Sequence, residues 1–296
     1  GYIGLELGSF YAALGSKVTV VEATSGLLPG ADRDLVKVLH QSIEKNMHSI
    51  LLNTKVMQLK EVADGVQVTV QPPTGAPTED VYDRVLISIG RRPNTENLGL
   101  AHTRVEIDGR GFVKVDAQGR TAEPHIFAIG DISGDPMLAH RATHQGRLAA
   151  EVLHGSKAVF EPIAIPAVVF TDPELAWAGL TEQQCKDQNI RHSVARFPWA
   201  ASGRALTLDK TAGLTKLVID PEDGLLLGIG IVGSGAGELI AEGVLALEMG
   251  ALAEDVALSI HAHPTLSETM MESADVFFGK STHIYKPKRQ TASGPQ

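Results

Sequence analysis

The stretch Gly1-Tyr2-Ile3-Gly4, read together with Lys17-Val18-Thr19-Val20-Val21-Glu22, decides the fold. Its two glycines have the spacing of the last two in a GxGxxG motif, whose first glycine would lie two residues before residue 1. Between the two stretches, an apolar stripe predicts a helix over residues 2–15 with Gly15 as its C-cap. A helix and then a buried strand that ends in an acid are typical of a dinucleotide-binding unit. In such a unit the pyrophosphate lies against the helix N-terminus and the acid accepts hydrogen bonds from ribose hydroxyls.

The residues after Glu22 bear on which dinucleotide would bind. They are Ala23-Thr24-Ser25-Gly26, and none of them is an arginine that could neutralise a 2′-phosphate. We therefore predict NAD rather than NADP. The alternative is a pair of helix-packing glycines beside a surface glutamate, which would bind no nucleotide.

Residues 1–94 are predicted to form an α/β, Rossmann-like nucleotide-binding domain that is truncated at its first strand. Asp32 is expected to cap a second amphipathic helix over residues 35–43. Strict alternation over residues 66–70 predicts an antiparallel strand, and the apolar run 85–89 predicts a buried one.

Residues 95–162 are predicted to form a returning, FAD-binding central segment. A strand over residues 126–129 is expected to close at Gly130-Asp131, and a helix is expected from about residue 140 to 154. The Asp131 carboxylate can accept hydrogen bonds from a cofactor hydroxyl chain. A helix N-terminus facing an isoalloxazine ring would stabilise negative charge on the reduced ring. An aspartate that only caps the next turn is the alternative, and spacing alone does not decide between them.

Residues 163–285 are predicted to form a separate α+β domain, because short strands here alternate with helices. A hairpin is expected across residues 221–224, and helices are expected near 236–249 and 265–277. The polar end, residues 286–296, is expected to be disordered.

Composition limits the partners and the compartment. The 296 residues are enough for about two domains, and the net charge of −9 argues against nucleic acid or an anionic membrane as a main partner. No apolar run is long enough to span a bilayer. The single cysteine, Cys185, rules out an internal disulfide framework and favours a reducing compartment, which we take to be the cytoplasm. Cys185 is expected on a surface helix, without a redox role.

The run His261-Ala262-His263-Pro264-Thr265-Leu266-Ser267-Glu268 contains the candidate catalytic residues. An imidazole oriented by a carboxylate is a suitable base for thiol chemistry near neutral pH. Any dithiol that it served would lie elsewhere, because the chain has one cysteine. Thr265 and Glu268 also match a capping box, so closing a helix start is an alternative role for Glu268, compatible with the first. His261 is a second candidate base, and no metal site is predicted.

Six stretches, in order, resemble the dihydrolipoamide dehydrogenases of the flavin-dependent pyridine nucleotide–disulfide oxidoreductases, and the resemblance spans residues 1 to about 285. The stretches are 1–6, 90–94, 126–131, 136–140, 197–205 and 261–268. The resemblance implies NAD contacts at Gly1, Gly4, Glu22, Val56 and Gly90. It implies FAD contacts at Gly130, Asp131, Met137, Leu138, Ala139 and His140. It further implies that Glu6 pairs with a lysine beside the flavin, that His263 is the catalytic base oriented by Glu268, and that the His263–Pro264 bond is cis.

The resemblance also implies a whole protein larger than this chain. The family's redox-active cysteine pair, its main FAD-binding glycine motif and the lysine partner of Glu6 belong to an N-terminal portion that is absent here. We therefore expect a fragment without turnover of its own. The implied activity is the oxidation of protein-bound dihydrolipoamide by NAD, through FAD and a redox disulfide. The resemblance implies that residues 163–285 are the dimerisation domain. Implied partners are a second copy in a homodimer and the lipoyl domains of 2-oxo acid dehydrogenase complexes. The alternatives are another disulfide reductase such as glutathione reductase, or a non-catalytic dimerisation fragment.

Overall fold

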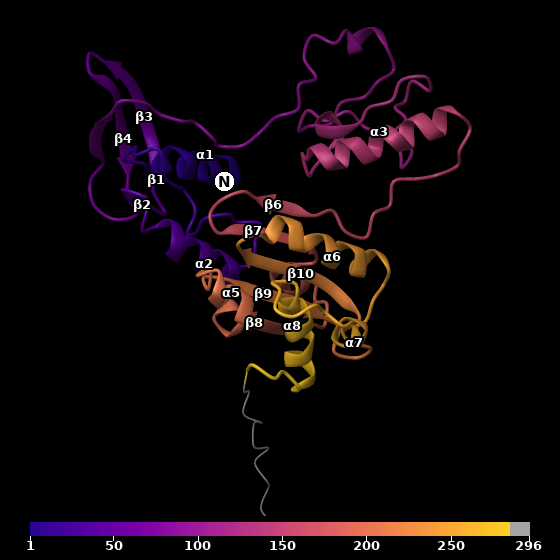
Figure 1. Cartoon of the computed structure of the whole chain (residues 1–296). Coiled ribbons are helices and arrows are strands. Elements are labelled where there is room, and N and C mark those ends of the chain that lie inside the picture. Colours follow the sequence, from indigo (N-terminus) through magenta and orange to yellow (C-terminus); the bar gives the residue numbers. More distant parts are fainter. Residues whose placement is uncertain (285–296) are drawn as a thin grey trace, which may run out of the picture. The chain divides into compact units, whose positions relative to one another are not determined.

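The structure, a computed structural model, describes residues 1–284 and divides into two compact units (Figure 1). The first unit joins residues 1–88 to the described residues from Pro166 onward, and the second unit is residues 89–165. The domain boundaries that the sequence suggested, near 94 and 162, stay predictions. The predicted disorder of residues 286–296 lies outside the described residues.

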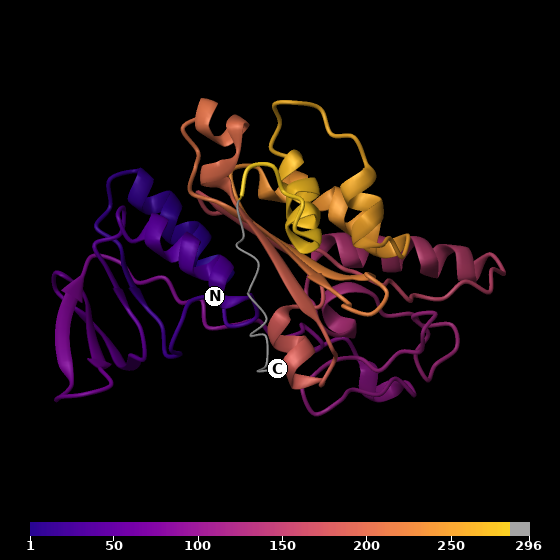
Figure 2. The same ribbon diagram turned by 90° about the horizontal axis from the view of Figure 1, so that it is seen from below.

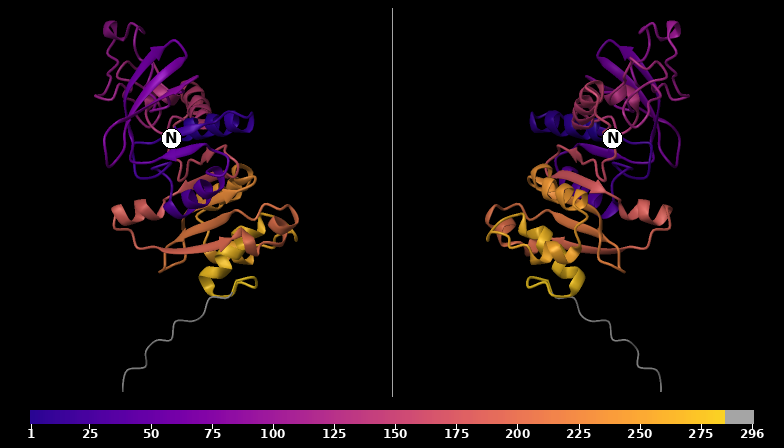
Figure 3. Two further views of the ribbon diagram at one scale, coloured as in Figure 1. Left: turned by 90° about the vertical axis from the view of Figure 1, so that its left-hand side faces the viewer. Right: turned by 90° about the vertical axis from the view of Figure 1, so that its right-hand side faces the viewer.

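The N-terminal part of the first unit is an α/β arrangement. Its elements are α1 (Tyr2–Ala13), β1 (Thr19–Val21), α2 (Arg33–Ile43), β2 (Ser49–Leu51), β3 (Lys55–Val62), β4 (Gly65–Gln71) and β5 (Thr78–Tyr82). β1 and β2 pair in parallel, whereas β3, β4 and β5 form a separate antiparallel sheet, seen in side view in Figure 3. The predicted helix, strand and alternating antiparallel strand are therefore confirmed.

The end of α1 shows why Gly15 is needed there. Its φ is +95°, a left-handed conformation that glycine adopts without a steric penalty. The Gly15 N–H donates to Ala12 and the Ser16 N–H donates to Tyr11, at 2.9 and 3.0 Å. These two bonds form a Schellman motif, which satisfies the last carbonyls of the helix.

Two of the predicted strands are wrong. The run 85–89 is neither paired nor buried, since Ile87 is 62% exposed and Ile89 is 95% exposed. Its apolar composition is that of a buried strand, but a strand also needs a hydrogen-bonding neighbour, and no described strand pairs with it. Residues 126–129 likewise form only an isolated bridge, between Phe127 and Arg120.

The second unit contains little regular structure apart from one long helix. Its elements are η1 (Leu100–His102), η2 (Gly130–Ser133) and α3 (Ala139–Leu153). The helix predicted from about residue 140 to 154 is confirmed by α3. η2 begins at Gly130, whose φ is +72°, and the Gly130 N–H donates to Gln145 Oε1 at 2.8 Å.

The C-terminal part of the first unit is built on a five-stranded antiparallel sheet of order β6-β7-β10-β9-β8. Its strands are β6 (Ala167–Val169), β7 (Glu174–Gly179), β8 (Ser193–Pro198), β9 (Leu214–Ile219) and β10 (Leu226–Gly233). Its helices are α4 (Glu182–Asp187), η3 (Trp199–Ala201), α5 (Gly203–Thr207), α6 (Ala236–Glu248), α7 (Ala253–Leu258) and α8 (Glu268–Phe278). The predicted hairpin is confirmed by β9 and β10, and the predicted helix near 236–249 by α6. The other predicted helix is α8, which begins three residues later than expected.

Opposite faces of this sheet are covered by different helices. On β10, Ile229 packs against Gly243 of α6, and a Cβ at the next residue, Gly230, would overlap Leu35 of α2. Successive residues of a strand point to opposite faces. Hence α6 and α2 lie on opposite faces, and α7 and α8 share the side of α6 (Figure 2). The core continues from α2 into the sheet, through Leu35 and Val232 among others.

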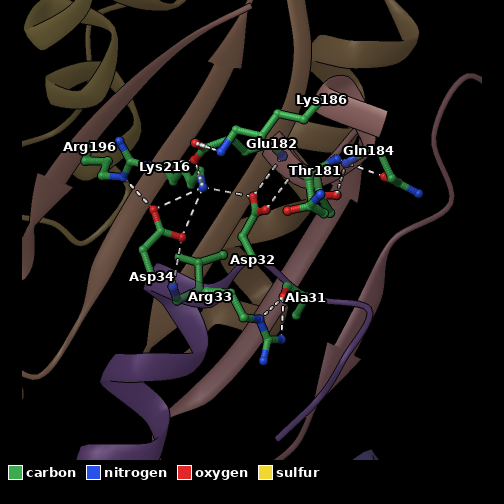
Figure 4. Close-up of polar contacts among 12 residues, drawn as sticks. Ala31, Asp32, Arg33, Asp34, Thr181, Glu182, Gln184, Lys186, Arg196 and Lys216 are labelled. Carbon is green, nitrogen blue, oxygen red and sulfur yellow. Dashed lines mark hydrogen bonds and ion pairs between the residues drawn. The ribbon is translucent and has the colours of Figure 1, made fainter. Parts of the chain in front are cut away.

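A buried ion-pair cluster joins the start of α2 to this sheet (Figure 4). Lys216 of β9 is 1% exposed, and its ammonium lies 2.9 Å from Asp32, 3.0 Å from Asp34 and 2.8 Å from Glu182. Arg196 of β8 pairs with Asp34 and Glu182 from the more exposed side. We define these five residues as the Lys216 cluster.

The Lys216 cluster corrects the predicted role of Asp32. The residue does stand at the N-cap position of α2, but its side chain makes no capping bond there. Its two carboxylate oxygens instead accept from the N–H groups of Glu182 and Gln183, at 3.1 and 3.3 Å, and so cap α4. Tertiary contact with Lys216 therefore overrides the local capping signal.

Cys185 lies on α4, between exposed neighbours, yet its side chain is fully buried. The helix is at the surface as predicted, but the cysteine is on its inward face. Burial raises the pKa of the thiol, and the carboxylates of Asp32 and Glu182 add to that effect. A thiol of this kind is a poor nucleophile.

Candidate active site

The loop between α7 and α8 brings His263 and Glu268 together. His263 Nδ1 lies 2.9 Å from Glu268 Oε1. The second oxygen of Glu268 accepts from the backbone N–H of Thr265 at 2.7 Å. The His263–Pro264 bond is cis, as the resemblance implied. Glu268 thus contacts the imidazole and also makes one of the two bonds of the predicted capping box. The N-cap of α8 is Ser267, which makes no side-chain capping bond.

The electrostatics of the pair keep Glu268 ionised. Burial by itself would raise the pKa of the carboxyl, but the Thr265 N–H and His263 bonds and the nearby charges hold it below its ordinary value. An ionised Glu268 accepts a hydrogen bond from the Nδ1–H of His263. This leaves Nε2 as the nitrogen that can exchange protons with a substrate. The side chain of His263 is 69% exposed and that of Glu268 is 18% exposed, so the ring is accessible while its partner is shielded.

The residues predicted at the nucleotide site gather at the N-terminus of α1. Gly1 precedes the helix, whose first turn has no side-chain cap and no acidic residue. A Cβ at Gly4 would lie 2.5 Å from Ser88 Oγ, so a glycine allows this close packing. Glu22 follows β1, and Glu22 Oε2 lies 3.7 Å from the nitrogen of Gly1.

Glu22 is held by its own loop. Its Oε1 accepts from both the N–H and the hydroxyl of Thr24, at 2.8 Å each. Burial raises the pKa of this carboxyl, but the bonds from Thr24 and the ammonium of Gly1 together outweigh burial, and the pKa is below its ordinary value. A fixed carboxylate beside an uncapped helix N-terminus fits the adenosine end of a dinucleotide.

Three other predicted residues lie on other parts of the chain. Glu6 is implied to pair with a lysine that lies outside this chain, and its Oε1 accepts from the backbone N–H of Phe170 at 2.8 Å. Val56 is 48% exposed on β3. Gly90 belongs to the second unit, where its φ of +131° needs a glycine.

The residues predicted at the flavin site lie on η2 and at the start of α3. Asp131 is 38% exposed and pairs with Arg91 at 2.7 Å. Gly130 allows the close approach of Ala142, because a Cβ there would lie 2.9 Å from the Ala142 Cβ. The first turn of α3 has no side-chain cap and no acidic residue. The predicted residues at the start of this helix are Met137, Leu138, Ala139 and His140. A reachable carboxylate and an uncapped helix N-terminus fit a hydroxyl chain and an electron-rich ring.

The sequence predicted neither the ion pairs of the Lys216 cluster nor a second histidine–glutamate contact. His261 Nε2 lies 2.8 Å from Glu242 Oε1. The available signal for Lys216 was a lysine inside the otherwise apolar run 214–219. For Glu242 there was no local signal, because 19 residues separate it from His261.

Two family models cover most of the chain. The pyridine nucleotide-disulphide oxidoreductase model matches residues 1–146, and the dimerisation domain of the same family matches residues 165–274. The chain therefore belongs to the pyridine nucleotide–disulphide oxidoreductases and carries their dimerisation domain.

Within this family, the curated relatives with high similarity are dihydrolipoyl dehydrogenases. The chain is 48% identical over 288 residues to the one from Vibrio cholerae and 46% identical over 284 residues to the one from Geobacillus stearothermophilus. These matches cover 97% and 96% of this chain and 60% of each relative. The chain thus spans about 60% of the length of the relatives that it matches.

Solved structures agree with this placement. The chain is similar to LpdA from Mycobacterium tuberculosis, with a TM-score of 0.83 and 28% identity over 93% of this chain and 59% of that one. It is also similar to RclA, a HOCl-induced flavoprotein disulfide reductase from Escherichia coli, with a TM-score of 0.82 and 28% identity over 94% and 62% of the two chains. In the described residues, no helix is long and apolar enough to cross a membrane.

Proposed function

We propose that this chain is the C-terminal part of a dihydrolipoyl dehydrogenase, which oxidises protein-bound dihydrolipoamide with NAD. The proposal is supported by the 48% identity to a relative of that name and, above all, by the His263–Glu268 contact of 2.9 Å. The redox disulfide would be supplied by residues outside this chain, since Cys185 is its single cysteine and is buried.

The chain's own residues would transfer a proton, stabilise the resulting charge and help to hold the cofactors. His263 Nε2 takes the proton of a dihydrolipoamide thiol, which leaves a thiolate, the nucleophilic form of sulfur. Glu268 holds the ring through Nδ1 and stabilises the imidazolium that forms. FAD and NAD, when bound, supply the electron and hydride transfer. Asp131 and the start of α3 would hold FAD, and Gly1, Gly4 and Glu22 would hold NAD.

NAD is favoured over NADP by the setting of Glu22. Its carboxylate is ionised and fixed by Thr24, and a 2′-phosphate beside it would be repelled. This argues for a dihydrolipoyl dehydrogenase over an NADP-dependent glutathione reductase.

We further propose a homodimer, supported by the dimerisation-domain match over residues 165–274. The lipoyl domains of 2-oxo acid dehydrogenase complexes are the proposed partners, because they carry the dihydrolipoamide. A cytoplasmic location is proposed because the single cysteine fits a reducing compartment.

The test is His263→Gln in the full-length enzyme. Loss of the base should lower dihydrolipoamide turnover by roughly 100-fold or more, in line with general base catalysis. Transfer of electrons from NADH to an artificial acceptor should persist, because that reaction needs no thiol base. His125→Gln is the matched control, since His125 also lies near a glutamate, at 3.5 Å from Glu123, and is 79% exposed. Full dihydrolipoamide turnover by the His263 variant would refute the proposed function.

A further inference from the structure

We propose that His261 is a positioning residue for the base at His263, which it serves by anchoring the connecting loop to α6. The imidazole of His261 bridges the Ser259 carbonyl and the Glu242 carboxylate. This inference rests on the proposed function only for the role of His263.

The geometry of His261 differs from that of its neighbour two residues later. Its Nδ1 lies 2.8 Å from the carbonyl oxygen of Ser259, and its Nε2 lies 2.8 Å from Glu242 Oε1. The side chain is 6% exposed, against 69% for His263. The ring of His261 is therefore enclosed and has a partner on each nitrogen, so it is unsuited to exchange protons with a substrate.

The two partners of the ring belong to different parts of the fold. The contact of Nδ1 with the Ser259 carbonyl ties the ring to the backbone at the start of the loop. The contact of Nε2 with Glu242 ties the same ring to α6, and a hydrogen bond to a carboxylate is stronger than one between neutral groups. His261 therefore links the loop to α6.

This anchor matters because the other side-chain hydrogen bonds of the loop are local. Residues 259–267 have no regular secondary structure, and Ile260 is fully exposed. Among residues 1–284, the other side-chain hydrogen bonds of the loop run to α7, to the start of α8 or within the loop itself, as with Thr265 and Ala262. The bond from His261 to Glu242 connects the loop to α6.

The anchor stands two residues before His263, and Glu268 stands five residues after it. Glu268 orients the ring of His263 but makes no bond to the backbone before it. His261 restrains that backbone from the other side. A displacement of about 1 Å in a catalytic group can cost on the order of 100-fold in rate. Loss of the anchor should therefore lower kcat while the affinity for the substrate is retained.

The experiment uses the full-length enzyme and the variants His261→Leu, His261→Gln and Glu242→Leu. His261→Leu should lower kcat for dihydrolipoamide about 10- to 100-fold, with KM changed less than about threefold. His261→Gln keeps a donor toward Glu242 and should recover part of the loss. The double variant that combines His261→Leu with Glu242→Leu should be no worse than either single variant, because the two residues act as one unit. NADH oxidation by an artificial acceptor should not change in any of them.

His192→Leu is the matched control. His192 makes the same short-range contact as His261, with Nδ1 2.8 Å from the carbonyl of the residue two positions earlier, Ile190. It makes no hydrogen bond with a glutamate in the part of the chain that the structure describes, and it lies outside the loop that carries His263. The kcat of the His192→Leu enzyme for dihydrolipoamide should stay within about twofold of that of the unmodified enzyme.

Four outcomes are distinguishable. If His263→Gln abolishes thiol turnover and the His261 variants do not change it, the positioning role is overturned and the proposed function stands. If His263→Gln keeps full turnover, the proposed function fails, and with it the positioning role. If His261→Leu and His261→Gln lower both the thiol and the acceptor reactions equally, or both fail to fold, His261 is merely structural and the inference is overturned. A selective, partly recovered loss of kcat supports it.

Discussion

Replacement of Lys216 by methionine would test how much the buried cluster contributes to stability. Methionine has a similar length and no charge, so the change removes the ammonium and leaves most of the packing. Three carboxylates then share a single cation within the cluster, Arg196, which is itself 40% exposed. Asp32 is 8% exposed and has little access to water that could solvate its charge.

The expected loss of stability in Lys216→Met follows from how deeply the ion pairs are buried. Removing one partner of a buried ion pair costs about 3–5 kcal/mol, because the remaining charge is left without compensation. Lys216 is 1% exposed, so this range applies to it. The carboxylate of Glu182 also pairs with Lys186, at 2.7 Å, but that lysine is 55% exposed. A solvated pair of that kind contributes about 0–1 kcal/mol.

The assay is denaturant unfolding of Lys216→Met and Lys186→Met, followed by circular dichroism and by tryptophan fluorescence. We expect the Lys216 variant to lose at least about 2 kcal/mol more than the Lys186 variant. Addition of Glu182→Gln to Lys216→Met should restore part of the loss, because it removes one uncompensated charge. Equal stabilities for the two single lysine variants would refute the assignment of the cluster as a buried, stabilising contact.

Three further predictions concern other parts of the chain. Hydrogen bonds and charges from Lys186, Lys216 and Arg196 outweigh the rise that burial causes and hold the pKa of Glu182 at about 2, against an ordinary 4.5. Its contribution to stability is therefore complete above about pH 4.5 and is lost as the pH falls through about 2. Acid titration of the unfolding free energy should show a smaller slope in this window for Glu182→Gln, and identical slopes would contradict the shift. Gly213→Ala should cost roughly 1–3 kcal/mol in denaturant unfolding, because its Cβ would overlap the buried ring of Trp199, whereas Gly203→Ala has open space and should be nearly neutral. Cys185 should resist alkylation by iodoacetamide at about pH 8 until the protein unfolds, and rapid labelling of the native protein, seen by mass spectrometry, would disprove its burial.

The sequence predicted those elements whose determinants are local. The glycine at residue 15 and the apolar stripe before it define α1, and the strict alternation over residues 66–70 defines β4. The hairpin across residues 221–224 has its turn residues and both apolar strands within the range 214–233. In each case the spacing of the apolar residues and the type of the turn residues indicate the same element. Such elements can therefore be predicted from one sequence.

The elements that were wrong depend on distant partners. Residues 85–89 have the apolar composition of a buried strand, but composition does not supply a neighbouring strand. Asp32 has the residue type and position of a helix cap, but its carboxylate is bound by Lys216 and by α4, which are far away in the sequence. The pattern of neighbouring residues in the sequence does not indicate contacts with residues that are far away in it.

The contacts of the candidate site also divide into those that are local in the sequence and those that depend on the fold. His263 and Glu268 are five residues apart, so their contact could be anticipated from spacing and from the capping signal at Thr265. Glu242 lies on another helix, and its contact with His261 required the fold. The nucleotide residues Gly1, Gly4 and Glu22 were found because one short helix and one strand place them together.

The two-sided contact of Glu268 has a consequence for the most conservative change that can be made there. In Glu268→Gln, the amide oxygen must face the Thr265 N–H, since an NH2 group would oppose another donor. The amide NH2 then points at Nδ1 of His263, which has to become the acceptor. The ring would be locked in the opposite tautomer, with its proton on the solvent-facing nitrogen. An isosteric glutamine would thus preserve the shape of the site while presenting a substrate thiol with a donor where it needs a base.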